Sequence, residues 1–352
     1  MLQQKVYNAP CGWWICHCGF SVVNNIAYRE RYVNEIHITI SDSGLKSFLQ
    51  KRFPIVEVPL ESFQDADFFI GDTFSTHIDR FKGVRVLYTG ENHPIDLNRF
   101  DYCLTHEFVE NDRCHRFPYW QNVLMWQPEL RAYLKGERTK VTPEELRERQ
   151  TEFCAFVCRN AKGKERNAFV RALSKVRKVN CGGPFMNNIG YVLPRPYEVK
   201  REFQSRHCFS MAYENEAAAG YQTEKIIDAF VSGSIPLYWG NPEVTREFNP
   251  ASFVHARDFR SRKEMIEYLL ELADDPVRRA EMINADILQD SEVFEKADRA
   301  LEEFFARIFE RGARVIQRTR LQRFLGVAQN YYGHGLFRTL RYVSRRIRGK
   351  ME

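Results

Sequence analysis

The 352-residue chain lacks an apolar run of membrane-spanning length, and no signal peptide is recognisable. Its nine cysteines include no CxxC pair, and the spacing of Cys11, Cys16 and Cys18 matches no common zinc pattern. Three more cysteines fall in predicted strands, where a free thiol behaves as a small apolar group: Cys154, Cys158 and Cys208. We therefore expect no structural metal and no disulfide framework. The odd cysteine count and the missing signal peptide predict a cytoplasmic protein.

The chain is long enough for two domains. Apolar content drops in the charged stretch 135–150, KGERTKVTPEELRERQ, where Thr142 followed by Pro143 is typical of a helix start. We predict an α/β fold with an N-terminal domain over residues 1–140, a C-terminal domain over 151–310 and a tail over 311–352.

The most strongly patterned stretch predicts a strand–loop–helix–strand unit. Apolar and aromatic residues favour a strand over Cys208–Tyr213, and residues 215–222 read as a loop. Thr223 is a suitable N-cap for the helix that follows, and Gly233 suits a left-handed helix end before a strand over Ile235–Trp239. In open α/β sheets ligands bind beyond the carboxyl ends of strands, where a helix N-terminus favours anions.

A second unit of this kind comes earlier in the chain. The run Phe153–Cys158 predicts a strand, the polar residues RNAKGKERN follow, and Ala168–Val176 reads as an amphipathic helix. Arg166 and Lys225 would then face one anionic ligand from two neighbouring strand-to-helix loops.

Several motifs carry a family resemblance. The run YENEAAAGYQTEKIIDAFVSGSIPLYWGNPEVTREFNPASF resembles the α1,3/4-fucosyltransferases, in particular the bacterial enzymes that make Lewis-type antigens. Four further motifs appear in the matching order: VLYTGEN at 86–92, FDYCLTH at 100–106, FVCRNAKGKERNAF at 156–169 and CGGPFMNNIGY at 181–191. The resemblance covers roughly residues 84–260.

This resemblance implies a GT-B architecture, two Rossmann-like lobes facing a central cleft. It implies inverting transfer of L-fucose from GDP-fucose to a GlcNAc or Glc hydroxyl of a β-galactoside-containing oligosaccharide. The acceptor would resemble N-acetyllactosamine, the linkage would be α1,3 or α1,4, and the product would decorate lipopolysaccharide or another surface glycan.

The resemblance also assigns roles to residues of this chain. Glu91 in TGEN falls on the general base, with Tyr88 near the sugar, and Glu224 could help an oxocarbenium-like sugar or hold the ribose. The residues implied in binding GDP-fucose are Tyr88, Arg166, Asn215, Tyr221, Glu224 and Lys225. An acceptor hydroxyl is a poor nucleophile, so a carboxylate must take its proton, and fixed cations stabilise the charge that grows on the departing diphosphate.

No Asp-x-Asp motif lies in a plausible donor loop, whereas Arg166 and Lys225 supply positive charge directly. We therefore expect no metal site, and activity that persists in EDTA even if a divalent ion stimulates product release.

The net charge of +6 is concentrated towards the C-terminus, where 311–325 and 337–350 are rich in arginine. Apolar residues interleave with these arginines, which predicts a basic amphipathic helix on an anionic membrane surface at the inner face of a bacterial membrane. The alternative is a solvated helix that packs back across the lobes. No heptad repeat precedes this tail.

Two other functions remain open at this point. A nucleic-acid-binding protein would explain the basic tail but not TGEN or GYQTEK, so we expect no nucleic acid partner. A GT-B transferase with another nucleotide-sugar donor, or with α1,2 or α1,6 linkage, would share these motifs.

Overall fold

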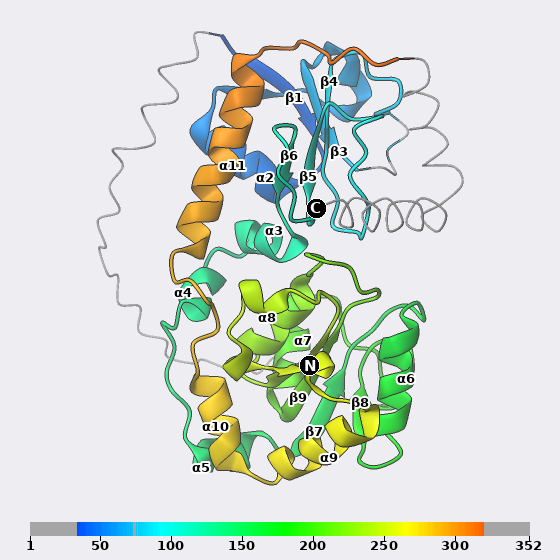
Figure 1. Cartoon of the computed structure of the whole chain (residues 1–352), viewed down its shortest axis with the longest axis vertical. Helices are drawn as coiled ribbons and strands as arrows, with labels where there is room; N and C mark the ends of the chain where they lie inside the picture. Colours follow the sequence, from blue (N-terminus) through cyan, green and yellow to red (C-terminus); the bar gives the residue numbers. More distant parts are fainter. Residues whose placement is uncertain (1–33, 73–74, 76, 320–352) are drawn as a thin grey trace, which may run out of the picture.

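The computed structural model describes residues 34–72, 75 and 77–319, which form two lobes stacked along the long axis of the molecule (Figure 1). Each lobe contains one sheet, and neighbouring strands pair in parallel throughout. The N-terminal sheet has the order β2 (Ile55–Glu57), β1 (Ile36–Ile40), β3 (Phe68–Gly71), β4 (Val84–Leu87), β5 (Tyr102–Thr105) and β6 (Cys114–Arg116). The C-terminal sheet has the order β11 (Val254–His255), β10 (Ile235–Trp239), β9 (His207–Tyr213), β7 (Glu152–Phe156) and β8 (Val179–Cys181). The predicted α/β class is confirmed.

Helices connect the strands and join the two lobes. The α-helices are α2 (Ser43–Arg52), α3 (Tyr119–Trp126), α4 (Leu130–Leu134), α5 (Pro143–Arg149), α6 (Lys164–Leu173), α7 (Tyr197–Ser205), α8 (Glu224–Val231), α9 (Arg262–Ala273), α10 (Pro276–Asn284) and α11 (Val293–Glu310). Short 3₁₀ helices are η2 (Leu60–Asp65), η3 (Val244–Arg246), η4 (Pro250–Ser252) and η5 (Ala256–Asp258). None of the helices within the described residues is both long and apolar enough to cross a membrane.

The C-terminal lobe contains both predicted strand–loop–helix units. β9 is buried along its whole length, β10 has the predicted bounds, and Gly233 adopts the left-handed conformation (φ 71°) expected after α8. Thr223 stands at the N-cap of α8 as predicted, but its hydroxyl makes no capping bond.

The first unit differs from the prediction at both of its boundaries. β7 ends at Phe156, so Cys158 lies in a loop and not in a strand. α6 begins four residues before the predicted Ala168, because Gly163 takes a left-handed conformation (φ 98°) that turns the chain early. Arg166 consequently lies in the first turn of the helix.

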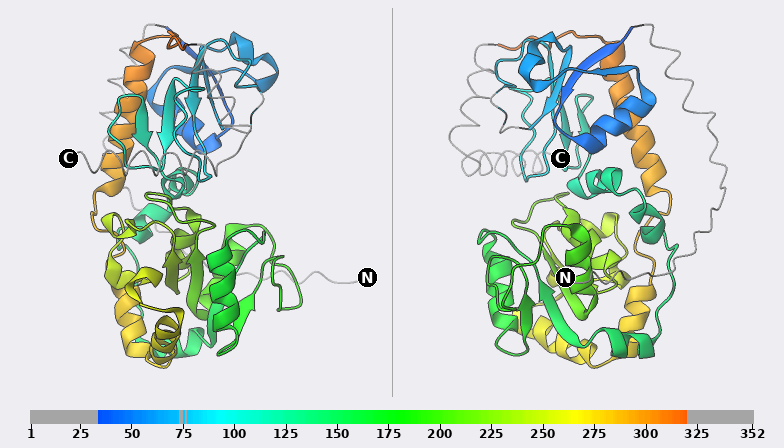
Figure 2. Two further views of the ribbon diagram at one scale, coloured as in Figure 1. Left: turned by 45° about the vertical axis from the view of Figure 1, so that its right-hand side comes forward. Right: turned by 180° about the vertical axis from the view of Figure 1, so that it is seen from behind.

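The C-terminal end of the described chain corrects the predicted domain bounds. α11 was assigned to the C-terminal domain, but it packs against the N-terminal sheet (Figures 1 and 2). The ring of Phe309 lies 5.0 Å from that of Phe53 and 5.1 Å from that of Phe68. Beyond α11, Arg318 donates to the fully buried Asp101 at 2.8 Å. The beginning of the predicted tail thus lies on the N-terminal lobe, and residues 337–350 lie outside the described part.

The predicted boundary region joins the lobes. Thr142 and Glu145 form a capping box at the start of α5, with Thr142 Oγ1 accepting from the Glu145 N–H at 3.2 Å. Before it, α3 brings Trp120 into a fully buried position against Phe248, with ring centroids 5.1 Å apart. On its other side α3 contacts the N-terminal lobe, where Asn122 donates to Asp42 at 3.0 Å, so this helix lies between the two lobes.

Candidate active site

The order of the strands determines where a ligand can bind. From β7 the chain continues to β8 on one side of the C-terminal sheet and later to β9 and β10 on the other. Two loops therefore diverge at the carboxyl ends of β7 and β9 and leave a crevice between them. Arg166 follows β7 and Lys225 follows β9, as the sequence predicted.

A cavity of about 670 Å³ opens at this crevice and reaches the other lobe. This volume lies in the usual range of small-molecule sites. The N-terminal lobe contributes residues that follow β3 and β4, and α3 contributes Tyr119; together these are Asp72, Thr89, Gly90, Glu91 and Tyr119. The C-terminal lobe contributes most of the polar lining, including Arg159, Asn160, Arg166, Arg195, Lys200, Asn215, Tyr221, Thr223, Glu224 and Lys225.

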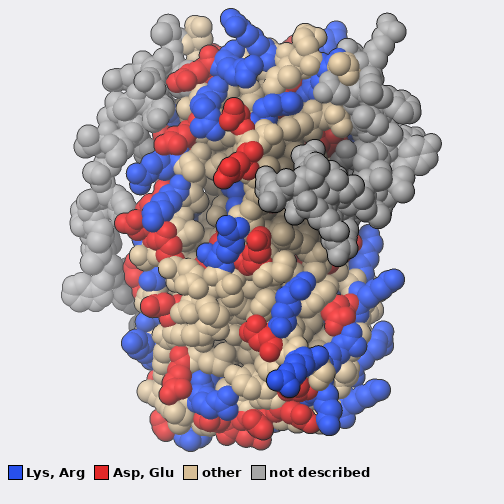
Figure 3. All heavy atoms as spheres, viewed as in Figure 1, with Lys and Arg blue, Asp and Glu red and all other residues tan. Residues whose placement is uncertain are grey.

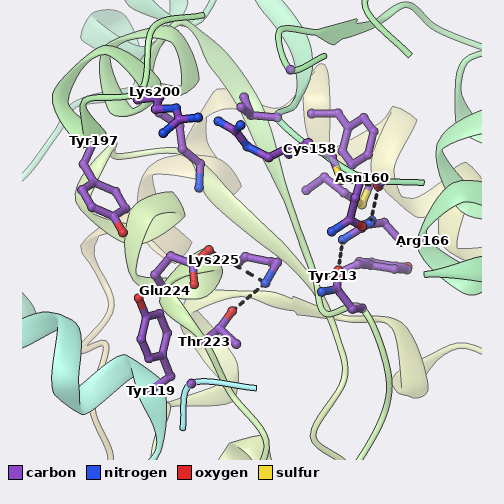
Figure 4. Close-up of a pocket in the computed structure, with 18 of the residues that line it drawn as sticks. Tyr119, Cys158, Asn160, Arg166, Tyr197, Lys200, Tyr213, Thr223, Glu224 and Lys225 are labelled. Atoms are coloured by element: carbon purple, nitrogen blue, oxygen red, sulfur yellow. Dashed lines mark hydrogen bonds and ion pairs between the residues drawn. The ribbon is translucent and has the colours of Figure 1, made fainter. Parts of the chain in front are cut away.

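Arg166 is held by neutral oxygen atoms. Its guanidinium donates to Asn215 Oδ1 at 2.6 Å and to the carbonyls of Asn160 and Lys162 at 3.2 and 3.1 Å (Figure 4). A Cβ at Gly163 would lie 3.2 Å from the guanidinium carbon, so glycine suits both the turn and this close approach. The side chain is 2% exposed and keeps its full positive charge beside the cavity.

Lys225 is held by a buried carboxylate. Its ammonium donates to Glu214 Oε2 at 2.8 Å and to Thr223 Oγ1 at 2.7 Å. Burial alone would lower the pKa of Lys225, but Glu214 and Glu224 outweigh that effect and the net pKa is raised. Lys225 is therefore a fixed and permanently charged donor at the start of α8.

Glu224 shares the first turn of α8 and also lines the cavity (Figure 4). Burial would raise its pKa, yet Lys225 and Lys200 lower it overall, so this carboxylate is ionised at neutral pH. Lys200 reaches the cavity from α7 and is itself bound to the fully buried Asp228 at 2.7 Å.

The loop between β9 and α8 is in contact with the N-terminal lobe. Gly220 has a left-handed conformation (φ 79°), and a Cβ there would overlap the carbonyl oxygen of His106. Arg116 donates to the Gly220 carbonyl at 3.3 Å and pairs with Glu247 at 2.7 Å. Next to Gly220, the ring of Tyr221 packs edge-on against His106 at 5.3 Å and borders the cavity.

Glu91 faces the same cavity from the opposite lobe. It is exposed in the loop after β4, and the adjacent Asn92 donates to Glu216 across the lobes at 3.0 Å. Tyr88 does not line the cavity. It is only 8% exposed and packs in the N-terminal core, with its ring 5.7 Å from that of Phe117. Tyr88 thus lies in the core directly before the lining residue Thr89, and its position near a bound sugar stays a prediction.

Several lining residues were missed by the sequence analysis. Arg159 and Arg195 are exposed and lie in the loops after β7 and β8, while Lys200 lies on α7. Between residues 159 and 178 there are eight Lys and Arg residues and one Glu, and basic side chains gather along the edge of the lobe that α6 forms (Figure 3). Clusters of basic residues at a cleft concentrate anionic ligands. The density of basic residues was the available signal for Arg159.

The cavity therefore offers cations for a polyanion on one lobe and a solvent-accessible carboxylate on the other. Nowhere in the described part of the chain do three or more His, Cys, Asp or Glu side chains gather as ligands for a metal ion. Arg166, Lys225 and the N-terminus of α8 supply positive charge that suits a diphosphate.

Comparisons with known proteins agree with this arrangement. Residues 146–282 match the model described as glycosyltransferase family 10 (fucosyltransferase) C-terminal, and residues 37–123 match the alpha-(1,3)-fucosyltransferase FucT N-terminal domain. Alpha-(1,3)-fucosyltransferase FucT of Helicobacter pylori is 35% identical over a region covering 53% of this chain and 43% of that protein. A putative fucosyltransferase of Acanthamoeba polyphaga mimivirus is 23% identical, covering 76% and 47%. The chain thus spans about half the length of these curated relatives.

The same family appears among solved structures. A crystal structure of an alpha1,3-fucosyltransferase is 26% identical, with a TM-score of 0.63 over 77% of this chain and 90% of that one. Structures described as containing GDP and GDP-fucose give TM-scores of 0.62 and 0.60. The two facing parallel sheets are those of the GT-B fold. The chain belongs to glycosyltransferase family 10, the fucosyltransferases.

Proposed function

We propose that this protein transfers L-fucose from GDP-fucose to a GlcNAc or Glc hydroxyl of a β-galactoside-containing oligosaccharide, in α1,3 linkage. The observation that carries the proposal is one cavity that presents Arg166 and Lys225 from the C-terminal lobe and Glu91 from the N-terminal lobe. Family membership and the likeness to structures with GDP and GDP-fucose support the choice of donor.

The diphosphate of the donor would lie against Arg166, Lys225 and the N-terminus of α8. These positive groups stabilise the charge that grows on the departing GDP as the bond to the sugar breaks. The groups are already held in place by Asn215 and Glu214, so little reorganisation is needed during the reaction.

Glu91 would remove the proton from the acceptor hydroxyl as it attacks the anomeric carbon. A carboxylate on the lobe opposite the phosphate-binding residues suits attack from the face opposite the leaving group, which inverts the configuration. Glu224, Asn215 and Tyr221 are then left to contact the fucose and the ribose. Glu224, ionised in the first turn of α8, suits a hydroxyl or a developing oxocarbenium ion.

The acceptor we propose resembles N-acetyllactosamine, and the product would decorate lipopolysaccharide or another surface glycan. We also propose that the enzyme works at the inner face of a bacterial membrane. The support for this is the basic amphipathic sequence over 337–350, whose arginines suit an anionic surface.

The function can be tested in two steps with the full chain. Calorimetry against GDP, UDP and ADP should show tight binding of GDP alone. A transfer assay with GDP-fucose should then fucosylate N-acetyllactosamine in preference to lacto-N-biose and lactose, in the presence of EDTA. Preference for UDP would overturn the proposed donor, and complete, metal-reversible loss in EDTA would overturn the metal-free neutralisation of the diphosphate.

A further inference from the structure

The buried carboxylate of Glu214 has no role in the reaction as proposed above, although it lies directly behind the cavity. Glu214 is the residue after β9, is fully buried, and its backbone N–H donates to the Trp239 carbonyl at the end of β10 at 2.8 Å. A buried, ionised carboxylate is costly unless it is paired and hydrogen-bonded. Its partners therefore indicate what it does.

Both carboxylate oxygens of Glu214 are engaged by the start of α8. Oε1 accepts from the Thr223 backbone N–H at 2.7 Å and from its hydroxyl at 3.0 Å. Oε2 accepts from the same hydroxyl at 2.8 Å and from the Lys225 ammonium at 2.8 Å. Thr223 in turn accepts from Lys225 at 2.7 Å, so the three side chains form a closed triangle.

This triangle leaves Lys225 one donor for a ligand. An ammonium has three N–H groups, and Glu214 and Thr223 take two of them. Glu224 lies at 3.9 Å, which is too far for a hydrogen bond. Because Lys225 lines the cavity, its third N–H is available there.

Asn215, the residue after Glu214, binds Arg166 as Glu214 binds Lys225. Asn215 accepts from Arg166 at 2.6 Å, and successive side chains at the end of a strand point to opposite sides. The two consecutive residues that follow β9 thus hold Lys225 and Arg166, respectively.

We propose that Glu214 is a positioning residue for this fucosyltransferase: it holds Lys225 charged and directed at the diphosphate of the nucleotide sugar. The inference rests on the proposed function, because it presumes that the cavity binds GDP. The competing role is purely structural, with Glu214 serving only to cap α8 by accepting the Thr223 N–H.

Glu214→Gln separates the two roles. The amide oxygen of glutamine can still accept the Thr223 N–H, so a capping function should survive. The largest of the charges that raise the pKa of Lys225 is lost, which leaves Glu224 to oppose the burial that lowers this pKa. Lys225 should then release its proton within the accessible alkaline range, and GDP binding should weaken as it does so.

The measurement is GDP affinity by calorimetry between pH 7.5 and 9.5. The wild-type affinity should vary little across this range, whereas that of Glu214→Gln should fall by up to about tenfold per pH unit above the new pKa. Adding Lys225→Arg to Glu214→Gln should abolish the fall, since a guanidinium does not deprotonate. Glu247→Gln, which removes a carboxylate paired with Arg116 away from the cavity lining, is the matched control and should keep the wild-type profile.

Equal pH profiles for Glu214→Gln and wild type would overturn the inference while leaving GDP binding intact. Absence of GDP binding by the wild type at every pH would instead overturn the proposed function, and this inference with it. If Glu214→Gln fails to fold, the pH dependence of GDP affinity in the wild type still tests the inference. If the GDP affinity of the wild type falls above pH 8, and Lys225→Arg removes that fall, then Glu214 does not keep Lys225 protonated. A wild-type affinity that stays constant with pH would support the inference.

Discussion

The cations of the cavity differ in how their charge is balanced. Lys225 is paired with Glu214, and Lys200 with Asp228, both fully buried carboxylates. The guanidinium of Arg166 donates instead to an amide oxygen and two carbonyls, so its charge is not cancelled by them. Arg166 should consequently contribute more of the attraction for a diphosphate than Lys225 does.

Replacing Arg166 should therefore weaken both binding and catalysis. Arg166→Ala removes charge-assisted hydrogen bonds that act in the ground state and in the transition state, and should raise the Kd for GDP about ten- to a hundredfold with a further loss of turnover. Calorimetry and initial rates measure the two effects. Arg171→Ala, an exposed arginine on the same helix, is the control for a lost surface charge. Unchanged GDP affinity in Arg166→Ala would show that the diphosphate lies elsewhere.

Replacing Glu91 should lower turnover without weakening GDP binding. Glu91→Gln should lower kcat by roughly a hundred- to ten-thousandfold, because the acceptor hydroxyl loses its base. GDP affinity should stay near that of the wild type, since Glu91 lies on the other lobe. Full turnover in Glu91→Gln would remove this residue from the role of base.

At the scale of elements, the loop between β9 and α8 depends on contact with the N-terminal lobe. Gly220 combines a left-handed backbone with a position where a Cβ would overlap the His106 carbonyl. This close approach is one of the contacts that place Tyr221 at the cavity, beside the bond from the Gly220 N–H to Asn241 Oδ1 at 2.7 Å.

Gly220→Ala should lower kcat/KM by about tenfold or more, because the added methyl group forces the loop away from the other lobe. Gly190→Ala is a matched control: Gly190 also has a left-handed backbone (φ 85°), but no atom lies within 4 Å of a Cβ there. That control should lose only about 1 kcal/mol of stability and keep its kinetics. If Gly190→Ala lost as much kcat/KM as Gly220→Ala, the loss would be due to backbone strain and not to the contact between the lobes.

The packing of α11 on the N-terminal sheet makes stability depend on pH. His115 of β6 stacks on Phe304 of α11 at 5.3 Å. Burial, followed by the charges of Arg307 and Arg116, lowers the pKa of His115 to about 4. The unfolded chain, with a histidine pKa near 6.5, binds the proton more readily, so stability is lost as the pH falls from about 6.5 towards 4.

The free energy of unfolding should therefore decrease over that pH interval. His115 should account for at most about 2 to 3 kcal/mol of the decrease. Urea unfolding of wild type and His115→Gln at pH 7, 5.5 and 4.5 measures this share, because the other titrating groups are common to both proteins. A wild-type stability that falls no more steeply than that of the variant would contradict the lowered pKa.

These elements also show what the sequence can predict. Periodic apolar runs bounded by glycine identify β9, α8 and β10 almost to the residue, because local propensity and burial agree there. The placement of α11 could not be predicted, since an amphipathic helix does not specify which lobe will cover its apolar face. The surroundings of Tyr88 and Glu214 depend likewise on long-range packing: both residues directly follow a strand, but Tyr88 packs against Phe117 whereas Glu214 binds Lys225.

At the scale of the whole molecule, the proposed chemistry is divided between the two lobes. Arg166 and Lys225 reach the cavity from the C-terminal lobe, and Glu91 reaches it from the N-terminal lobe. A base and a leaving-group site on opposite walls favour a single displacement at the anomeric carbon. The configuration of the product is thus a direct consequence of the proposed arrangement.

The most direct test is the configuration of the transferred sugar. The full chain is incubated with GDP-β-L-fucose and N-acetyllactosamine, and the product is analysed by NMR for its anomeric coupling constant and its linkage position. The account predicts an α-linked fucose on the 3-hydroxyl of GlcNAc. A β-linked fucose would contradict displacement across the cleft, and the absence of any fucosylated product would contradict the proposed activity.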